Sequence, residues 1–308
     1  MSLSFQSLLS AEQITTEDIY QLVHLANDYK RDLERVRKMD VLSGYVLGTL
    51  FFEPSTRTRF SFESAMYRLN GNVITLEQAE SSSLKKGESL ADMGRVVSAY
   101  ADIIVIRHPM PGSVEAFSKF ASVPTINAGD GPNQHPTQSL VDLYTIFSEK
   151  GRIENISIGF VGDLKYGRTV HSLIKLMTLF GASFTFISHP SLCVPDALRK
   201  ELLSSGCAIR ETESLQDGLS GLDVLYVTRI QRERFESQDA YEGVKNLYRI
   251  DRNQVASLSD LIILHPLPRV SEISTEVDGL PQAKYFEQVD YGVYIRMALL
   301  KMMIQSRK

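Results

Sequence analysis

Short apolar runs alternate with amphipathic segments along most of the chain. Runs rich in β-branched and aromatic residues predict buried strands in the first half, at residues 45–52, 72–76, 102–106 and 123–127. The second half repeats the pattern at residues 156–161, 183–187, 208–210, 224–228 and 261–264. Between the runs, apolar residues recur with helical spacing, as at residues 16–38, 87–100 and 113–120. The alternation predicts an α/β protein of two domains, each a mostly parallel sheet flanked by helices.

The segment after the first strand combines hydroxyl groups with guanidinium groups. Pro54 ends the strand, because proline has no N–H for a sheet ladder. Ser55, Thr56, Arg57 and Thr58 then fall on the first turn of a helix that ends at Asn70 and Gly71. Free backbone N–H groups and the positive end of the helix dipole lie at the same turn. The segment predicts a phosphate site, against the simpler alternative of a serine cap with solvated arginines.

Composition narrows the class of protein. The chain has 308 residues, enough for two domains, and its net charge of −4 argues against a nucleic-acid-binding surface. Cys193 and Cys207 form no CxxC pair and lie near no histidine cluster, so we expect two ordinary buried thiols, no metal and a reducing compartment. No leader pattern or long apolar run is present, which predicts a cytoplasmic protein that does not interact with membranes.

Polar and basic residues gather where strands end. Arg107, Arg168 and Arg229 each follow a predicted strand, as do His135 and Gln138. Ligands of parallel α/β sheets bind outside the carboxyl ends of the strands. Together with Arg57 these arginines give four guanidiniums at one pole, which would repel each other if uncompensated. We therefore expect an anionic ligand in a cleft between the two domains. For His135 the alternative is a structural histidine beside a proline.

A dinucleotide site is disfavoured at the turn of residues 162–168. The turn lacks the G-x-G-x-x-G pattern, and the next strand ends at Ser188 instead of an acid that could hold a ribose. Lys165 and Arg168 make the turn basic. A P-loop is also absent from the sequence.

Several motifs in order resemble the aspartate/ornithine carbamoyltransferase family. They are FFEPSTRTR, SSSLKKGES, VIRHP, NAGDGPNQHPTQSL, VGDLKYGRTVHSL, VTRIQRER and HPLPR, and they run from residue 51 to residue 269. The resemblance implies a first domain, residues 1–135 with 291–308, that binds carbamoyl phosphate. It implies a second domain, residues 136–290, that binds aspartate.

The resemblance also implies roles for single residues. Phosphate would be bound by Ser55, Thr56, Arg57, Thr58 and Arg107. The carbamoyl carbonyl would be polarised by Thr58, Arg107 and His135, and its NH₂ would be held by Gln138 and the loop Pro266, Leu267 and Pro268. The carboxylates of aspartate would be bound by Arg168, Arg229 and Gln231. Ser82 or Ser83, with Lys86, would enter the active site of a neighbouring subunit, which implies a homotrimer with shared sites.

The implied reaction is attack of the L-aspartate amine on the carbamoyl carbon, an early step of de novo pyrimidine biosynthesis. It needs no cofactor and no metal, because two anionic substrates are held together and oriented by positive charge. Whether a separate regulatory chain binds the trimer is left open. Aspartate is favoured over ornithine, since an ornithine ammonium would be repelled by Arg229 and since residues 265–268 read His-Pro-Leu-Pro, where ornithine enzymes carry His-Cys-Leu-Pro. The alternatives are an ornithine-type transferase and a non-catalytic anion-binding module.

Overall fold

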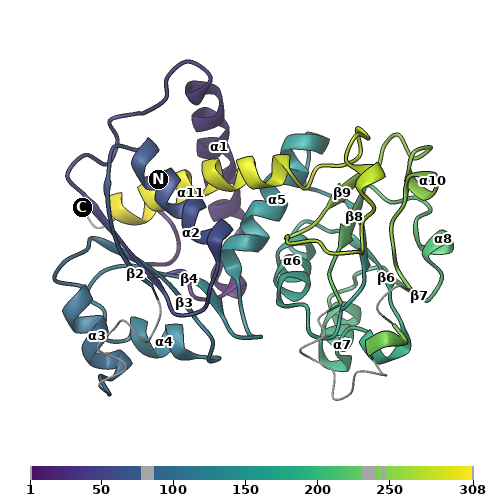
Figure 1. Ribbon diagram of the computed structural model, residues 1–308, viewed down its shortest axis with the longest axis horizontal. Coiled ribbons are helices and arrows are strands. Elements are labelled where there is room, and N and C mark those ends of the chain that lie inside the picture. Colours follow the sequence, from purple (N-terminus) through teal and green to yellow (C-terminus); the bar gives the residue numbers. More distant parts are fainter. Residues whose placement is uncertain (1, 78–86, 231–240, 245–246, 307–308) are drawn as a thin grey trace. The chain divides into compact units, whose positions relative to one another are not determined.

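A computed structural model describes residues 2–77, 87–230, 241–244 and 247–306 of the chain (Figure 1). The chain forms two compact units. The first contains Met1–Tyr144 and Val289–Lys308, and the second contains Thr145–Gln288. Two helices carry the chain across these borders, α5 (Pro136–Lys150) and α11 (Glu287–Gln305). Each unit is built on one parallel sheet.

The first unit has a four-stranded sheet in the order β2-β1-β3-β4. Its strands are β1 (Val46–Phe51), β2 (Asn72–Glu77), β3 (Ile103–His108) and β4 (Thr125–Asp130). Its helical segments are η1 (Ala11–Gln13), α1 (Thr16–Leu33), α2 (Thr56–Arg68), α3 (Leu90–Val97) and α4 (Ser113–Ser118). Figure 1 shows α3 and α4 on one side of this sheet and α2 and α11 on the other.

Alternation along β1 explains why helices cover both faces of the first sheet. Leu50 packs with Phe117 and Ile104 in the core beneath α3 and α4. Thr49 points to the opposite face, where its hydroxyl donates to Glu63 of α2 at 3.4 Å. α2 buries one stripe of apolar side chains against this face, namely Phe62, Ala65 and Met66. The sheet therefore fixes the direction in which α2 leaves the end of β1.

The second unit has a five-stranded sheet in the order β7-β6-β5-β8-β9. Its strands are β5 (Ser157–Val161), β6 (Ser183–Ile187), β7 (Ile209–Thr212), β8 (Val224–Val227) and β9 (Ile262–Leu264). Its helical segments include α6 (Arg168–Thr178), η4 (Pro190–Leu192), α7 (Asp196–Ser204), α8 (Leu215–Gly218), α10 (Arg252–Val255) and η6 (Thr275–Val277). In Figure 1, α6 lies on one side of this sheet and α8 and α10 on the other. Rings of Phe160, Phe184 and Tyr226 pack together on it, with centroids 5.5–6.2 Å apart.

The predicted fold class, two parallel-sheet α/β domains flanked by helices, is confirmed. Several predicted element ends are wrong. α1 stops at Leu33 instead of residue 38, because the following residues are mostly charged and Val36 is 45% exposed, so nothing packs the extra turn. β3 extends to His108, which places Arg107 inside the strand instead of after it. Asn70 does end α2 in a left-handed conformation, with a φ of 67°.

The prediction of buried cysteines is also wrong. Cys193 is exposed and Cys207 is half-buried, and both are free thiols. Cys193 follows the single turn of η4, and Cys207 follows the left-handed Gly206 after α7. Both lie on surface connections, where an apolar side chain gains little burial.

Candidate active site

The order of the strands points to one place in each sheet. In the first sheet, the connection from β1 runs to β2 on one side, and β3 lies on the other side of β1. In the second sheet, β5 is followed by β6 on one side and is bordered by β8 on the other. Ligands of doubly wound sheets bind at the carboxyl ends of strands where the order reverses in this way. The ends of β1 and β3, and of β5 and β8, are thus the expected binding positions.

The N-terminus of α2 lies at the first of these positions. Ser55 is the N-cap residue, and its side chain makes no capping hydrogen bond. The N–H groups in the first turn of a helix have no acceptor within the helix. Because the serine hydroxyl does not occupy them, the N–H groups at Thr56, Arg57 and Thr58 can face an anion. The predicted phosphate segment is therefore on a helix N-terminus beside the end of β1.

Arg107 lies next to this turn. It pairs in register with Phe51 at the end of β1, and the pairing of β3 with β4 shifts register between Ile106 and His108. Such irregularities re-aim the side chain that they carry. Arg107 Nη2 donates to Glu53 Oε1 at 2.9 Å, and Nη1 donates to the Ala128 carbonyl at 3.3 Å. Glu53 therefore offsets part of the positive charge of Arg107.

One donor of Arg107 stays open. The residue is only 9% exposed, and its Nε is buried without a hydrogen-bond partner among the described residues. A buried donor left unsatisfied is costly unless a ligand or water meets it. The pKa of the neighbouring Arg57 lies below its usual range, first because of partial burial and second because of the positive charge of Arg107. Two cations held this close favour an anion between them.

His135 and Gln138 stand at the start of α5, after the last strand of the first sheet. His135 is buried, and its carbonyl accepts the Gln138 N–H at 3.0 Å. The turn before it is organised by Asp130, whose carboxylate accepts from the Asn127 amide at 3.1 Å and the Gln134 N–H at 3.0 Å. Asp130 is buried and was not recognised in the sequence, although it stands within the motif NAGDGPNQHP. We call Ser55–Thr58, Arg107, His135 and Gln138 the first cluster.

Arg168 and Arg229 occupy the corresponding position in the second unit. Arg168 is the first residue of α6, and Arg229 follows the end of β8, which pairs with β5 through Val227 and Val161. The chain leaves β5 through Gly162, whose φ is 111° and where a Cβ atom would lie 2.3 Å from the Thr228 carbonyl oxygen. Only glycine fits this close approach. It brings the turn before Arg168 against the residue before Arg229.

The HPLPR segment follows β9, at the neighbouring strand end. His265 is buried, its Nδ1 accepts the Leu267 N–H at 2.7 Å, and its Nε2 lies 2.8 Å from Glu272 Oε1. Burial would raise the pKa of Glu272, but the hydrogen bond with His265 and two backbone N–H groups hold that pKa below its usual range. The carbonyls of Pro266 and Leu267 are thereby held at the strand end. We call Arg168, Arg229 and residues 266–268 the second cluster.

Some predicted site residues lie outside the described residues, namely Ser82, Ser83, Lys86 and Gln231. Among the described residues, no three His, Cys, Asp or Glu side chains gather as metal ligands would. No described helix has the length and apolar character needed to cross a bilayer.

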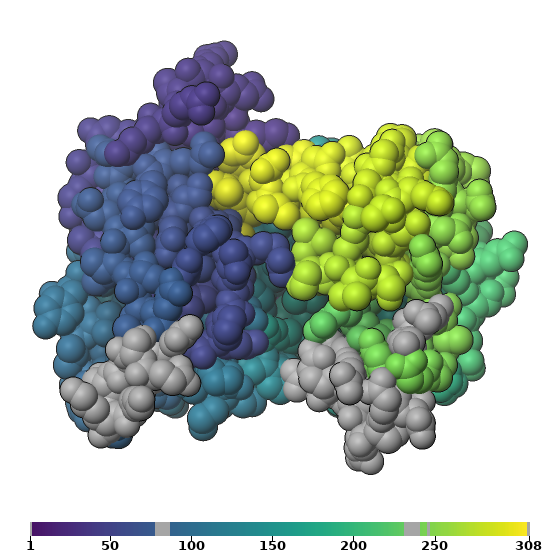
Figure 2. Space-filling model, in the orientation of Figure 1, coloured from purple at the N-terminus to yellow at the C-terminus, as the bar shows by residue number. Residues whose placement is uncertain are grey.

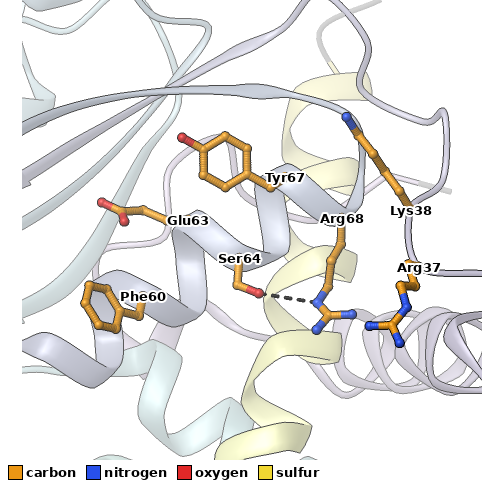
Figure 3. A pocket seen from close by; sticks show the side chains of 7 residues that line it. All are labelled: Arg37, Lys38, Phe60, Glu63, Ser64, Tyr67 and Arg68. Atoms are coloured by element: carbon orange, nitrogen blue, oxygen red, sulfur yellow. Dashed lines mark hydrogen bonds between the residues drawn. The ribbon is translucent and has the colours of Figure 1, made fainter.

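A hollow of about 540 Å³ lies on the outer side of α2 (Figure 3). Its lining residues are Arg37, Lys38, Phe60, Glu63, Ser64, Tyr67 and Arg68. In Figure 3 the basic side chains gather at one end, where Arg68 Nε donates to Ser64 Oγ at 3.3 Å. No residue of the first cluster lines it.

Two α/β units, each with basic residues at the reversal of its strand order, define a two-domain protein whose strand ends are suited to small anions. Residues 6–148 match the model of the aspartate/ornithine carbamoyltransferase carbamoyl-P binding domain, and residues 154–303 match the model of the Asp/Orn binding domain of that family. The chain belongs to the aspartate/ornithine carbamoyltransferase family.

Individual relatives agree with the family match. The aspartate carbamoyltransferase catalytic subunit of Methanocaldococcus jannaschii is 51% identical over 302 residues, which cover 98% of each chain. The corresponding subunit of Clostridium kluyveri is 48% identical over 95% of this chain and 96% of its own. The solved catalytic subunit from M. jannaschii matches with a TM-score of 0.93 over 98% of each chain. The aspartate transcarbamoylase of Trypanosoma cruzi, solved with N-(phosphonacetyl)-L-aspartic acid, matches at 40% identity with a TM-score of 0.91 over 97% of this chain and 96% of its own.

Proposed function

We infer that this chain is an enzyme that transfers the carbamoyl group of carbamoyl phosphate to the amine of L-aspartate, giving N-carbamoyl-L-aspartate and phosphate for pyrimidine biosynthesis. The relatives at about half identity over nearly the whole chain are aspartate carbamoyltransferase catalytic subunits. A relative from T. cruzi has been solved with carbamoyl phosphate and aspartate together. The observation in this chain that carries the inference is the pair Arg57 and Arg107 at the N-terminus of α2, with Arg107 Nε buried and open.

The first cluster would act on carbamoyl phosphate. Backbone N–H groups of the α2 turn and the Arg57 guanidinium bind the phosphate, as positive charge and a helix N-terminus favour. Thr58, Arg107 and His135 donate to the carbamoyl oxygen, where negative charge develops as the tetrahedral intermediate forms. Donors aimed at developing charge usually contribute the largest part of such a rate enhancement. Gln138 and the carbonyls of Pro266 and Leu267 hold the carbamoyl NH₂.

The second cluster would act on aspartate. Arg168 and Arg229, with Gln231, bind its two carboxylates, for which the guanidinium fork is suited. The amine nitrogen then forms a bond to the carbamoyl carbon, and the bond from that carbon to the phosphate oxygen breaks. The departing phosphate accepts the proton that the amine loses. No covalent enzyme intermediate is needed, because orientation and electrostatics carry the reaction.

The assembly would be a homotrimer in which Ser82, or Ser83, and Lys86 reach the site of a neighbouring copy. Residues 78–86 continue from β2, the edge strand of the first sheet. The same edge presents exposed apolar side chains, with Phe60 and Tyr67 of α2 each 53% exposed and Ile74 of β2 42% exposed. The dark-blue residues of α2 reach the surface on the face shown in Figure 2. A second copy of the chain is the partner that would cover them.

A cytoplasmic location is supported by the free thiols of Cys193 and Cys207, which suit a reducing compartment.

A bisubstrate analogue that joins a phosphonate to aspartate tests these roles. We expect it to bind far more tightly than either substrate, because one molecule then meets both clusters. Arg107→Ala and Arg229→Ala should each weaken its binding at least tenfold, as measured by calorimetry, since each removes a charge-assisted contact. Arg95→Ala, which removes an exposed arginine of α3, is the matched control and should bind normally. Normal binding by Arg107→Ala or Arg229→Ala would contradict the assigned roles, and phosphate release with ornithine but not aspartate would contradict the substrate.

A further inference from the structure

The side-chain amide of Gln138 is held in one orientation. Its Nε2 donates to Asp142 Oδ1 at 2.7 Å, one helical turn further along α5. Asp142 is fully buried. A carboxylate can only accept hydrogen bonds, so it pairs with the NH₂ of the amide and not with its oxygen. The Gln138 Oε1 atom is then the acceptor that is left to face a ligand.

Asp142 is in turn accompanied by a buried cation. Arg296 of α11 is 5% exposed, its Nη1 donates to Ser61 Oγ at 2.9 Å, and its guanidinium lies 5.0 Å from the centre of the Phe62 ring. Burial lowers the pKa of Arg296 to about 10, and the negative charge of Asp142 opposes that change. Two opposite charges buried together offset part of each other's desolvation cost.

Space for this cation is built into α11. A Cβ atom at Gly292 would lie 2.7 Å from Arg296 Nη1 and 3.6 Å from Ser61 Oγ. The Gly292 carbonyl also accepts from Arg296 Nη1, at 3.3 Å. Arg296 therefore joins α11 to α2, whose N-terminus carries Ser55–Thr58, through Ser61. The same stretch of α11 lies against α5, because a Cβ atom at Gly292 would lie 3.5 Å from Val141, the residue before Asp142.

We propose that Asp142, with Arg296 beside it, is a positioning residue that fixes Gln138 Oε1 as a hydrogen-bond acceptor for the carbamoyl NH₂, and so makes the site select carbamoyl phosphate over acyl phosphates without that NH₂. This inference rests on the proposed role of Gln138. An acyl phosphate such as acetyl phosphate carries a methyl group at that place, and it leaves the oriented acceptor unpaired. A site that holds a fixed acceptor rejects such an analogue more strongly than a site whose amide can turn over.

The test replaces the carboxylate by an amide. Asn at position 142 can donate or accept, so Asp142→Asn frees Gln138 to present either end of its amide. We expect kcat/KM for carbamoyl phosphate to fall roughly tenfold, while the inhibition constants of acetyl phosphate and inorganic phosphate, measured as competitors, stay within about twofold. In Gln138→Ala, kcat/KM for carbamoyl phosphate should fall at least as far. Adding Asp142→Asn to Gln138→Ala should cause no further loss, because the two changes remove one interaction.

Asp102→Asn is the matched control. Asp102 is also in the first unit and accepts the Val46 N–H at 2.8 Å, at the opposite ends of the strands from the first cluster. We expect it to leave the selectivity between carbamoyl and acetyl phosphate unchanged. Because Asp142→Asn leaves Arg296 buried without its acid, the pair Asp142→Asn with Arg296→Met provides a variant without a lone buried charge. This pair should fold and show the same loss of selectivity.

The outcomes distinguish a failure of the positioning role of Asp142 from a failure of the proposed carbamoyl transfer. If Asp142→Asn weakened the binding of carbamoyl phosphate and of acetyl phosphate equally, Asp142 would have a structural role only. The same would follow if the losses in kcat/KM caused by Asp142→Asn and Gln138→Ala multiplied in the double variant. Wild-type selectivity in the folded double variant would overturn the proposal as well. If the unaltered chain released no phosphate from carbamoyl phosphate with aspartate, the proposed function itself would fail.

Discussion

Two buried histidines, His108 and His265, use the same local arrangement at the ends of β3 and β9. In each, Nδ1 accepts the backbone N–H two residues further on, from Met110 at 3.0 Å and from Leu267 at 2.7 Å. A backbone N–H is always a donor, so Nδ1 carries no proton in either ring. Each His-Pro turn is thereby fixed beside a residue of the proposed site. The hydrogen bonds of both histidines are visible only in three dimensions.

A third histidine should make stability depend on pH. Burial lowers the pKa of His171 from its usual 6.5, and a hydrogen bond with the Leu164 carbonyl at 2.8 Å opposes part of that change. The unfolded chain therefore binds this proton at a higher pH than the folded chain does. Stability should be fully present above pH 6.5 and should fall as the pH drops through and below that value.

His171→Gln should remove this part of the pH dependence. We expect the difference in urea midpoint between pH 7.5 and pH 5.5 to be smaller for His171→Gln than for the unaltered chain. His24→Gln, which changes an exposed histidine of α1, should behave as the unaltered chain does. An unchanged pH dependence in His171→Gln would show that His171 is not the group responsible.

At the residue scale, the sequence predicts candidate binding residues but not the side chains that hold them in place. Arg107 is predicted as a ligand-binding residue from its place at a strand end. Its partner Glu53 lies 54 positions earlier, and the sequence predicts only that Glu53 lies at the end of a strand. The 2.9 Å ion pair is therefore not predictable from either residue alone. Asp142 follows Gln138 by four residues, a spacing that places both side chains on one face of a helix, so this pair is predictable from the sequence. Arg296 lies too far along the chain for the same reasoning.

At the scale of the elements, the sequence predicts well which segments form helices or strands, but not the residues at which they end. Every strand predicted in the first sheet exists, because short apolar runs are a strong signal for strands; β1, β3 and β4 are buried on both faces, whereas the edge strand β2 is largely exposed. The strand β3 nevertheless extends two residues further than predicted, through Arg107 and His108. Charged residues normally mark the end of a buried strand. Here Glu53 and Ala128 accept from the two Nη atoms of Arg107, and Met110 donates to His108, so pairing continues although Arg107 Nε stays open.

The turn from β5 to α6 should depend on Gly162. Gly162→Ala combines a φ of 111° with a Cβ atom 2.3 Å from the Thr228 oxygen, and we expect a loss of roughly 3 kcal/mol or more in the free energy of unfolding. Gly151→Ala is the matched control, since its φ is 70° and its Cβ would meet no atom within 4 Å. It should cost only about 1–2 kcal/mol. Urea unfolding of both variants measures the difference.

The same substitution should also affect function. Gly162 lies between the strand end and Arg168, and Thr228 precedes Arg229, so a shift of the turn moves both guanidiniums. We expect the KM for aspartate to rise in Gly162→Ala and to stay unchanged in Gly151→Ala. Equal unfolding free energies and equal KM values in the two variants would mean that the close approach at Gly162 is unimportant.

At the scale of the whole molecule, the alternation of strands and helices is sufficient to predict two parallel α/β units. The order of strands within each sheet is not predictable from this alternation, because it depends on which side each crossover takes. The strand orders explain why basic residues from distant strand ends come together within each unit. The proposed sharing of sites between subunits is not predictable from the alternation either, and it rests on the resemblance to the family.

Mixing two inactive variants tests that sharing. If Lys86 of one subunit completes the site that contains His135 of another, trimers that mix Lys86→Ala with His135→Ala chains contain some complete sites. We expect phosphate release to recover partly after the two variants are unfolded together and refolded. A mixture of Arg107→Ala with His135→Ala should stay inactive, because both residues belong to the first cluster of one chain. No recovery in well-formed mixed trimers would count against shared sites.

The helix α11 has a consequence for how the protein is made. Arg296 and Gly292 complete the first unit, yet the 144 residues of the second unit, Thr145–Gln288, are synthesised before them. At a ribosomal rate of about 5–20 residues per second, this interval lasts roughly 7–30 seconds. During that time the nascent first unit has Asp142 without its guanidinium and α2 without the helix that packs on it. The second unit, a continuous stretch of chain, is complete as soon as it leaves the ribosome.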